Sequence, residues 1–167
     1  MELCLKLPNE GDIPALLKLY ARVDRRYLSD RLPNPYTEAS ARWWLDLIRR
    51  EEGRGGVYRA ILADGVLIGT ISAERKADVF RRDAEMGYLL DPGFQARGIM
   101  TRAVEAFCPL AFDRLDLLRL SALVYAPNAA SRRVLEKNGF ALEGLLKQAV
   151  VKGDAVWDLC LYGRCRN

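Results

Sequence analysis

The sequence contains no histidine in 167 residues. This absence excludes a Ser-His-Asp triad, a Cys-His catalytic pair and any metal site with imidazole ligands. Proton transfer in this chain must use carboxylates, hydroxyls, amines, thiols or water. Most hydrolase mechanisms are therefore excluded, and we expect no metal cofactor.

Long apolar runs are also absent. No stretch approaches the roughly 20 apolar residues that cross a membrane, and the first ten residues carry two glutamates and a lysine, unlike a signal peptide. The cysteines form no Cys-x-x-Cys pair; they are Cys4, Cys108, Cys160 and Cys165. We expect a cytoplasmic protein with reduced thiols and no membrane partner, in which Cys108 and Cys160 are small core residues.

The charge is modestly basic, because 26 Lys and Arg against 22 Asp and Glu give a net charge of +4. Arginine supplies most of the cations, and its guanidinium pairs in bidentate fashion with phosphates and carboxylates. The charges are nevertheless scattered along the chain, which is typical of a solvated surface. No recognisable motif accompanies them, so direct binding of nucleic acid is not expected.

The length favours one domain over residues 1–167, since domains commonly span about 100–200 residues. Apolar residues at helical spacing predict four helices, near 13–23, 37–48, 98–111 and 129–137. Strand patterns lie near 2–7, 57–63, 66–75, 85–91, 117–125, 141–151 and 155–163. Helices interspersed among strands indicate an α/β or α+β domain with a single sheet and helices on both faces.

Local signals mark several boundaries. Asp12 and Thr37 are predicted helix caps, and Asp64-Gly65 predicts a hairpin turn. Pro109 lies inside the third helix and should kink or end it, because a proline in a regular helix interior costs about 3 kcal/mol. In the second helix Trp43 lies beside the apolar stripe, so that helix is either deeply packed or borders a ligand.

The most informative segment is a strand, a tight turn and the start of a helix, from Tyr88 to Thr101. The first amides of a helix have no acceptor inside the helix, and the helix dipole is positive there. Consecutive N–H groups between Gln95 and Thr101 can therefore hold an anion such as phosphate. Gly98 leaves no Cβ where the anion would approach the backbone.

A second motif follows another strand, with the sequence Pro127-Asn-Ala-Ala-Ser-Arg-Arg-Val-Leu-Glu-Lys-Asn-Gly-Phe140. Asn128 is a predicted N-cap, and Gly139 suits a left-handed helix end. Together with Ala-Glu-Met-Gly-Tyr at 84–88, Gly-Ile-Met-Thr at 98–101 and Glu-Gly at 143–144, this order and spacing resembles the GNAT superfamily of acyl-CoA N-acyltransferases. The sequence is most similar to the RimJ/RimL-like branch, the ribosomal-protein N-terminal acetyltransferases.

The resemblance covers the whole chain and implies a GNAT-type fold. That fold is a mixed, mostly antiparallel, splayed sheet of about six or seven strands with about four helices on both faces. It implies that acetyl-CoA enters the gap between the strands at 85–91 and 117–125 and bonds the first one as an added strand would. Its diphosphate would bind the amides of Gln95, Ala96, Arg97, Gly98, Ile99, Met100 and Thr101. Met100 stands where the family pattern has a small residue.

The resemblance also assigns chemical roles. Leu135 occupies the position of the common GNAT tyrosine, so the hydroxyl of Ser131, in the Asn-x-x-Ser motif with Asn128, is expected to protonate the departing thiolate. A structural role for Ser131, bonding back to Asn128, weighs equally. A backbone N–H at Leu89 or Leu90 would stabilise the oxyanion.

The base must be a carboxylate or water, because there is no histidine. Glu85, in the Ala-Glu-Met-Gly-Tyr motif, is the first choice; Asp158, Glu143 and water are alternatives. A structural salt bridge with an arginine is the competing interpretation of Glu85.

Three functions remain open at this stage. The first is acetylation of an α-amino group of a protein, such as the N-terminus of a ribosomal protein. The second is acetylation of a small amine (an antibiotic, polyamine or amino acid), and the third is a non-catalytic acyl-CoA-binding module. The loop at 25–36, the helix with Trp43 and Trp44, and the C-terminal hairpin are expected to select the acceptor. Homodimers are frequent among the proteins that the chain resembles.

Overall fold

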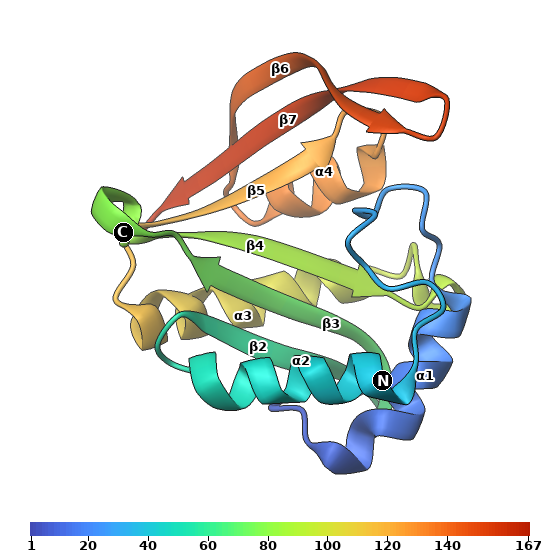
Figure 1. Cartoon of the computed structure of the whole chain (residues 1–167). Coiled ribbons are helices and arrows are strands. Elements are labelled where there is room, and N and C mark those ends of the chain that lie inside the picture. Colours follow the sequence, from blue (N-terminus) through green and yellow to red (C-terminus); the bar gives the residue numbers. More distant parts are fainter.

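A single seven-stranded sheet organises the computed structural model, which describes all 167 residues (Figure 1). The strands lie in the order β1-β2-β3-β4-β5-β7-β6, and only the β4–β5 pair is parallel. They are β1 (Leu3–Lys6), β2 (Gly56–Ala63), β3 (Val66–Arg75), β4 (Asp83–Leu90), β5 (Arg119–Tyr125), β6 (Ala141–Lys152) and β7 (Ala155–Cys165). The four α-helices are α1 (Ile13–Arg22), α2 (Glu38–Glu51), α3 (Ile99–Leu115) and α4 (Ala129–Lys137). The predicted mixed, mostly antiparallel fold is confirmed.

The helices cover both faces of the sheet. The larger core cluster joins α3 and Leu135 of α4 to β2–β5 and β7, while a smaller cluster joins α1 and α2 to Tyr58. Successive side chains of β4 alternate between these two clusters. Leu89 packs against the α1–α2 cluster, and Tyr88 and Leu90 pack against the α3 cluster. Each β4 side chain can therefore be assigned to one face.

The sheet opens between β4 and β5. Only Asp83–Glu85 of β4 pairs with β5, at Arg119–Ser121, and the two strands then diverge (Figure 1). Two halves of the sheet thus meet at one end and separate at the other. The predicted splay is confirmed.

Local signals explain why the elements begin and end where they do. The Thr37 hydroxyl accepts a hydrogen bond from the Ser40 amide and so caps α2 as predicted. The turn at Asp64 and Gly65 has positive φ at both residues, 48° and 79°, which gives the predicted β2–β3 hairpin. Cys108 and Cys160 are buried in the larger cluster, as expected, and all four cysteines are free.

One local prediction is wrong, and one of the two outcomes predicted for Pro109 does not occur. Asp12 precedes α1 but makes no cap hydrogen bond to it; its carboxylate instead accepts hydrogen bonds from the Asn9 amide and from Lys6 Nζ. Nor does α3 end at Pro109, since the helix continues to Leu115. Pro109 and Glu105, whose carbonyl loses its helical donor, are both exposed, so water can satisfy that carbonyl.

Trp43 on α2 is 65% exposed, whereas Ala41, Leu45 and Ile48 form the buried face of this helix. Trp43 therefore does not contribute to deep packing. None of the helices is both long and apolar enough to cross a membrane.

Candidate active site

The open edge of β4 is the first feature of the site. The Asp91 amide donates to the Ile68 carbonyl of β3, so the N–H of Asp91 is directed toward β3. Because N–H directions alternate along a strand, the N–H of Leu89 is directed toward β3 as well. The amides of Tyr88 and Leu90 then face the opposite edge, where pairing with β5 has already ended. An extended ligand can pair with this edge as an added strand does. Of the two amides predicted for an oxyanion, Leu90 faces the gap and Leu89 does not.

The turn after β4 presents a run of free amides. Ala96 and Gly98 have positive φ, 58° and 71°, and alternation of left-handed and right-handed residues directs successive N–H groups to one concave side. The six amides from Ala96 to Thr101 donate no hydrogen bond within the chain. The helical hydrogen bonds of α3 begin with the Arg102 amide, which donates to the Gly98 carbonyl. This concave run lies at the N-terminus of α3, where the helix dipole favours an anion.

The side chains of this turn do not block it. Residues 95–98 are exposed, while Ile99 and Met100 are buried in the larger core cluster. Met100 therefore occupies the small-residue position of the motif without projecting into the amide cradle. The Arg97 guanidinium lies over the Phe94 ring, 5.5 Å from its centroid, and adds positive charge beside the turn.

Across the gap, α4 carries Ser131. The Asn128 side chain accepts a hydrogen bond from the Ser131 amide at 3.2 Å, so Asn128 is the helix cap that the sequence predicts. The Ser131 hydroxyl does not bond back to Asn128: its Oγ lies 2.8 Å from the Tyr88 hydroxyl of β4. The side chains of Tyr88 on β4 and Ser131 on α4 therefore meet where β4 and β5 have separated.

Tyr88 ends the Ala-Glu-Met-Gly-Tyr motif of β4, and the sequence alone assigns it no chemical role. Burial raises the pKa of Tyr88 to about 12 and outweighs the lowering by the Ser131 hydrogen bond. Its hydroxyl remains protonated at neutral pH. An aromatic residue on the strand that lines the gap was the available signal, but the sequence did not show that its ring would reach α4.

The three candidate carboxylates lie in different surroundings. Glu85 is exposed on β4 and makes no ion pair or hydrogen bond, so the salt-bridge interpretation is wrong. Glu143 pairs with Arg119, with 2.8 Å between Oε1 and Nη2, and that hydrogen bond lowers the pKa of Glu143. The Gln148 amide donates to Asp158 and lowers the pKa of Asp158 in the same sense. Glu85 alone has no partner inside the chain.

Glu85 and Ser131 are not in contact. By alternation Glu85 lies on the same face of β4 as Leu89 but is exposed there, whereas Tyr88 and the Ser131 hydroxyl lie on the α3–α4 face. Glu85 pairs with Ser121 at the end of the β4–β5 ladder, and Tyr88 lies three residues further along β4, where the strands have separated.

A family model described as acetyltransferase (GNAT) domain matches residues 2–141. The chain belongs to the GNAT acetyltransferase family. The ribosomal-protein-serine acetyltransferase of Escherichia coli (strain K12) is 38% identical over 104 residues, which are 62% of this chain and 58% of that protein. The probable N-acetyltransferase YjcK of Bacillus subtilis (strain 168) is 39% identical over 112 residues, which are 67% of this chain and 60% of the relative. The matched segments thus span less than two thirds of these curated relatives.

A solved structure gives the fold comparison over nearly the full chain. The ribosomal L7/L12 α-N-protein acetyltransferase RimL, in complex with coenzyme A, superposes with a TM-score of 0.85 at 25% identity. The superposition covers 98% of this chain and 93% of that one. GNAT acetyltransferases use acetyl-CoA.

The residues of this GNAT chain fit such a ligand. A diphosphate requires convergent donors in a concave turn, and the amides of residues 96–101 supply them. A pantetheine arm with amide groups requires an open strand edge, and β4 supplies one beyond Glu85. Both features arise from the fold itself.

Proposed function

We propose that this GNAT chain transfers an acetyl group from acetyl-CoA to the α-amine of a protein or peptide N-terminus, by direct attack in a ternary complex. A ribosomal protein is the proposed acceptor class. The observation that carries the proposal is the continuous path from the open β4 edge to the free amides of residues 96–101. One end of this path suits an amide-containing arm and the other suits a diphosphate.

The proposed binding roles follow from the geometry. Gln95, Ala96, Arg97, Gly98, Ile99, Met100 and Thr101 form the diphosphate turn, mainly through their backbone amides. Asn128 holds the first turn of α4 and thereby presents Ser131. Bound acetyl-CoA supplies an activated thioester, and positioning the amine beside it can contribute several kcal/mol.

Three groups would act at the reacting atoms. The Leu90 amide, directed into the gap, stabilises negative charge on the acyl oxygen. The Ser131 hydroxyl gives its proton to the departing sulfur and regains one from water. Glu85, directly or through a water, accepts the proton that the amine must lose. Glu85 is preferred over Glu143 and Asp158 because those two are already bonded to cations or amides.

The choice of an α-amine has a physical reason besides the similarity to ribosomal-protein acetyltransferases. A free α-amino group has a pKa of about 7.7–8.0, against about 10.4 for lysine. Deprotonating a lysine would cost about 3 kcal/mol more, at 1.36 kcal/mol per pKa unit. A site that has a carboxylate but no histidine suits the easier deprotonation.

The test uses peptides that offer both a free N-terminus and an internal lysine, with the same peptides blocked at the N-terminus as controls. Thiol release is followed with time, and mass spectrometry locates the acetyl group. We expect acetylation at the α-amine and no product from the blocked peptides. Acetylation confined to the lysine would overturn the choice of acceptor, and an absence of thiol release with every amine would overturn the activity.

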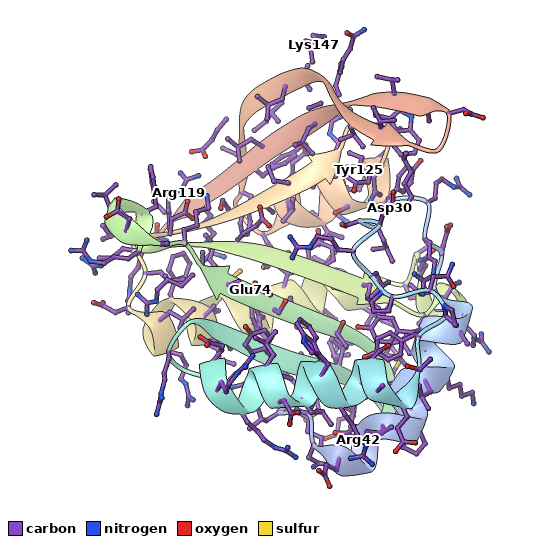
Figure 2. The ribbon with its side chains drawn as sticks, in the orientation of Figure 1. Asp30, Arg42, Glu74, Arg119, Tyr125 and Lys147 are labelled. Atoms are coloured by element: carbon purple, nitrogen blue, oxygen red, sulfur yellow. The ribbon has the colours of Figure 1, made fainter.

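A small polyamine is the second candidate, favoured by one observation. Glu74 of β3, labelled in Figure 2, lies directly opposite Glu85 of β4. Both are exposed, and neither has a cationic partner. Adjacent carboxylates repel each other unless a cation lies between them, and a polyamine carries several cations. A rate with spermidine that exceeds the rate with peptides, and that Glu74→Gln lowers, would favour this candidate.

A further inference from the structure

The Tyr88–Ser131 hydrogen bond crosses the open part of the sheet. Tyr88 comes from β4 in the N-terminal half, and Ser131 comes from α4 in the C-terminal half. Beyond the three-residue pairing of β4 with β5, no backbone ladder joins the halves at this level. The hydroxyl proposed as the proton donor is thus held by a residue on the strand that would bind the acetyl donor.

We propose that Tyr88 is a positioning residue, which donates its hydrogen bond to Ser131 Oγ so that the Ser131 proton is directed into the β4–β5 gap. The inference rests on the proposed function and deepens it. It gives a role to a tyrosine that the reaction does not otherwise use.

The physical argument begins with the freedom of a serine hydroxyl. A serine on a helix can rotate among staggered positions, and it often bonds a carbonyl of the preceding turn, which occupies its proton. The Tyr88 hydroxyl lies 2.8 Å from Ser131 Oγ and 3.3 Å from the Ser131 carbonyl oxygen, and either hydroxyl of the 2.8 Å pair can be the donor. We assign the Tyr88 proton to Oγ because that contact is the shorter of the two. A serine oxygen has one proton and two acceptor sites. When it accepts from Tyr88, its own proton remains available to the sulfur.

The same contact helps after the proton has moved. As the C–S bond breaks, the sulfur takes the Ser131 proton, and negative charge develops on Oγ until water returns a proton. A hydrogen bond from Tyr88 stabilises that charge, because donors to an ionised oxygen bind more strongly than donors to a neutral one. Burial raises the pKa of Tyr88 to about 12, so at neutral pH its hydroxyl is protonated and can donate this bond.

The experiment is a double-mutant cycle with Tyr88→Phe and Ser131→Ala, which reads kcat and the KM for acetyl-CoA separately. Phenylalanine keeps the ring that packs against the core and removes only the hydroxyl. Tyr58→Phe, which removes a buried tyrosine hydroxyl on β2, is the matched control. Thermal unfolding of every variant establishes that it is folded.

We expect Tyr88→Phe to lower kcat about 3- to 10-fold, as the loss of one hydrogen bond does, with less than a 2-fold change in KM. In the Ser131→Ala background the same substitution should change kcat less than 2-fold, because the group it positions is gone. Tyr58→Phe should leave both constants unchanged.

Two results would overturn the inference. If the two substitutions lower kcat by independent factors that multiply, Tyr88 does not act through Ser131. If KM rises while kcat is kept, Tyr88 only shapes the binding gap. Wild-type turnover tests the proposed function separately, since it must be present before the cycle begins; its absence would refute both.

Discussion

The Ser121 hydroxyl donates a hydrogen bond to the Asp83 carboxylate, with 3.0 Å between Oγ and Oδ1, at the place where β5 still pairs with β4. The other Asp83 oxygen lies 2.6 Å from Lys76 Nζ and 3.3 Å from Arg119 Nε. The Asp83 side chain is only 12% exposed. One carboxylate thus joins the end of β3, β4 and β5 at the closed end of the gap.

Asp83→Asn should lower the free energy of unfolding by about 1–3 kcal/mol, because the largely buried carboxylate loses its charge-assisted bonds to Lys76 and Arg119. The charge that Lys76 and Arg119 share would be lost, while the side-chain shape is kept. Urea unfolding followed by circular dichroism measures the change. Asp46→Asn removes an exposed pair with Arg49 and should cost less than about 0.5 kcal/mol. Equal costs for the two variants would contradict the role of Asp83.

Gly98 allows a second prediction, which concerns the diphosphate. Asparagine and aspartate both tolerate the left-handed backbone better than other residues, and nothing lies within 4 Å of a Cβ at Gly98. Gly98→Asp should therefore weaken coenzyme A binding at least about 10-fold more than Gly98→Asn, because only the first places a negative charge at the turn.

Calorimetry with coenzyme A and with acetyl-pantetheine, which lacks the diphosphate, separates a loss of diphosphate binding from a general loss of ligand binding. The two variants should bind acetyl-pantetheine equally. Equal affinities for coenzyme A would show that the diphosphate does not bind at residues 96–101.

Much of this architecture could be predicted from local patterns. Thr37, Asn128 and the Asp64-Gly65 turn act within a few residues of themselves, so their effects can be read from neighbouring sequence. The amide cradle at Gly98 is local in the same way. The splay between β4 and β5 came instead from a resemblance, since no spacing in the chain indicates where a sheet opens.

The remaining features depend on contacts between distant residues. Tyr88 reaches Ser131 across 43 positions, and Asp83 reaches Ser121 across 38. Asp12 was predicted to cap α1 because of its position, but Asn9 and Lys6 compete for its carboxylate. The continuation of α3 through Pro109 depends on which face of the helix meets water, which sequence periodicity alone did not decide.

The identity of the base gives a third prediction. Glu85→Gln should lower kcat/KM about 10²-fold or more at neutral pH, the smaller end of what a general base contributes. Glu143→Gln and Asp158→Asn should keep rates within about 3-fold, because hydrogen bonds already occupy those carboxylates. Full activity in Glu85→Gln would assign the proton to water.

Glu143 should affect stability rather than catalysis. Arg119 lowers the pKa of Glu143 below its ordinary value of 4.5. A carboxyl group with a lowered folded-state pKa stabilises the protein above its unfolded-state pKa, and this contribution is lost as the pH falls through the folded-state value. Glu143→Gln should therefore flatten the pH dependence of unfolding below about pH 4.5 and leave its shape near pH 7 unchanged. An unchanged acid slope would show that the Arg119 pair is broken in solution.

The loop between α1 and α2 gives the last prediction. Lys152, at the tip of the β6–β7 hairpin, donates to the Leu28 carbonyl at 2.8 Å and pairs with Asp30 at 2.6 Å. Next to these contacts the Tyr27 ring lies 5.4 Å from the Trp157 ring. The loop is thus tied to the far half of the sheet, across the opening through which an acceptor would reach the gap.

Lys152→Met removes the charge and keeps the aliphatic stem. We expect the acceptor KM to rise several-fold, because the loop loses its fixed position, while the affinity for coenzyme A at the α3 turn stays the same. Lys147→Met is the control, since Lys147 is on the same hairpin but points outward, is 75% exposed and contacts only Asp158 (Figure 2). Steady-state kinetics with a peptide acceptor measures the first quantity and calorimetry the second. If both constants changed together in Lys152→Met, the hairpin contact would support the whole domain rather than the acceptor side, and the assignment of this loop to acceptor binding would be wrong.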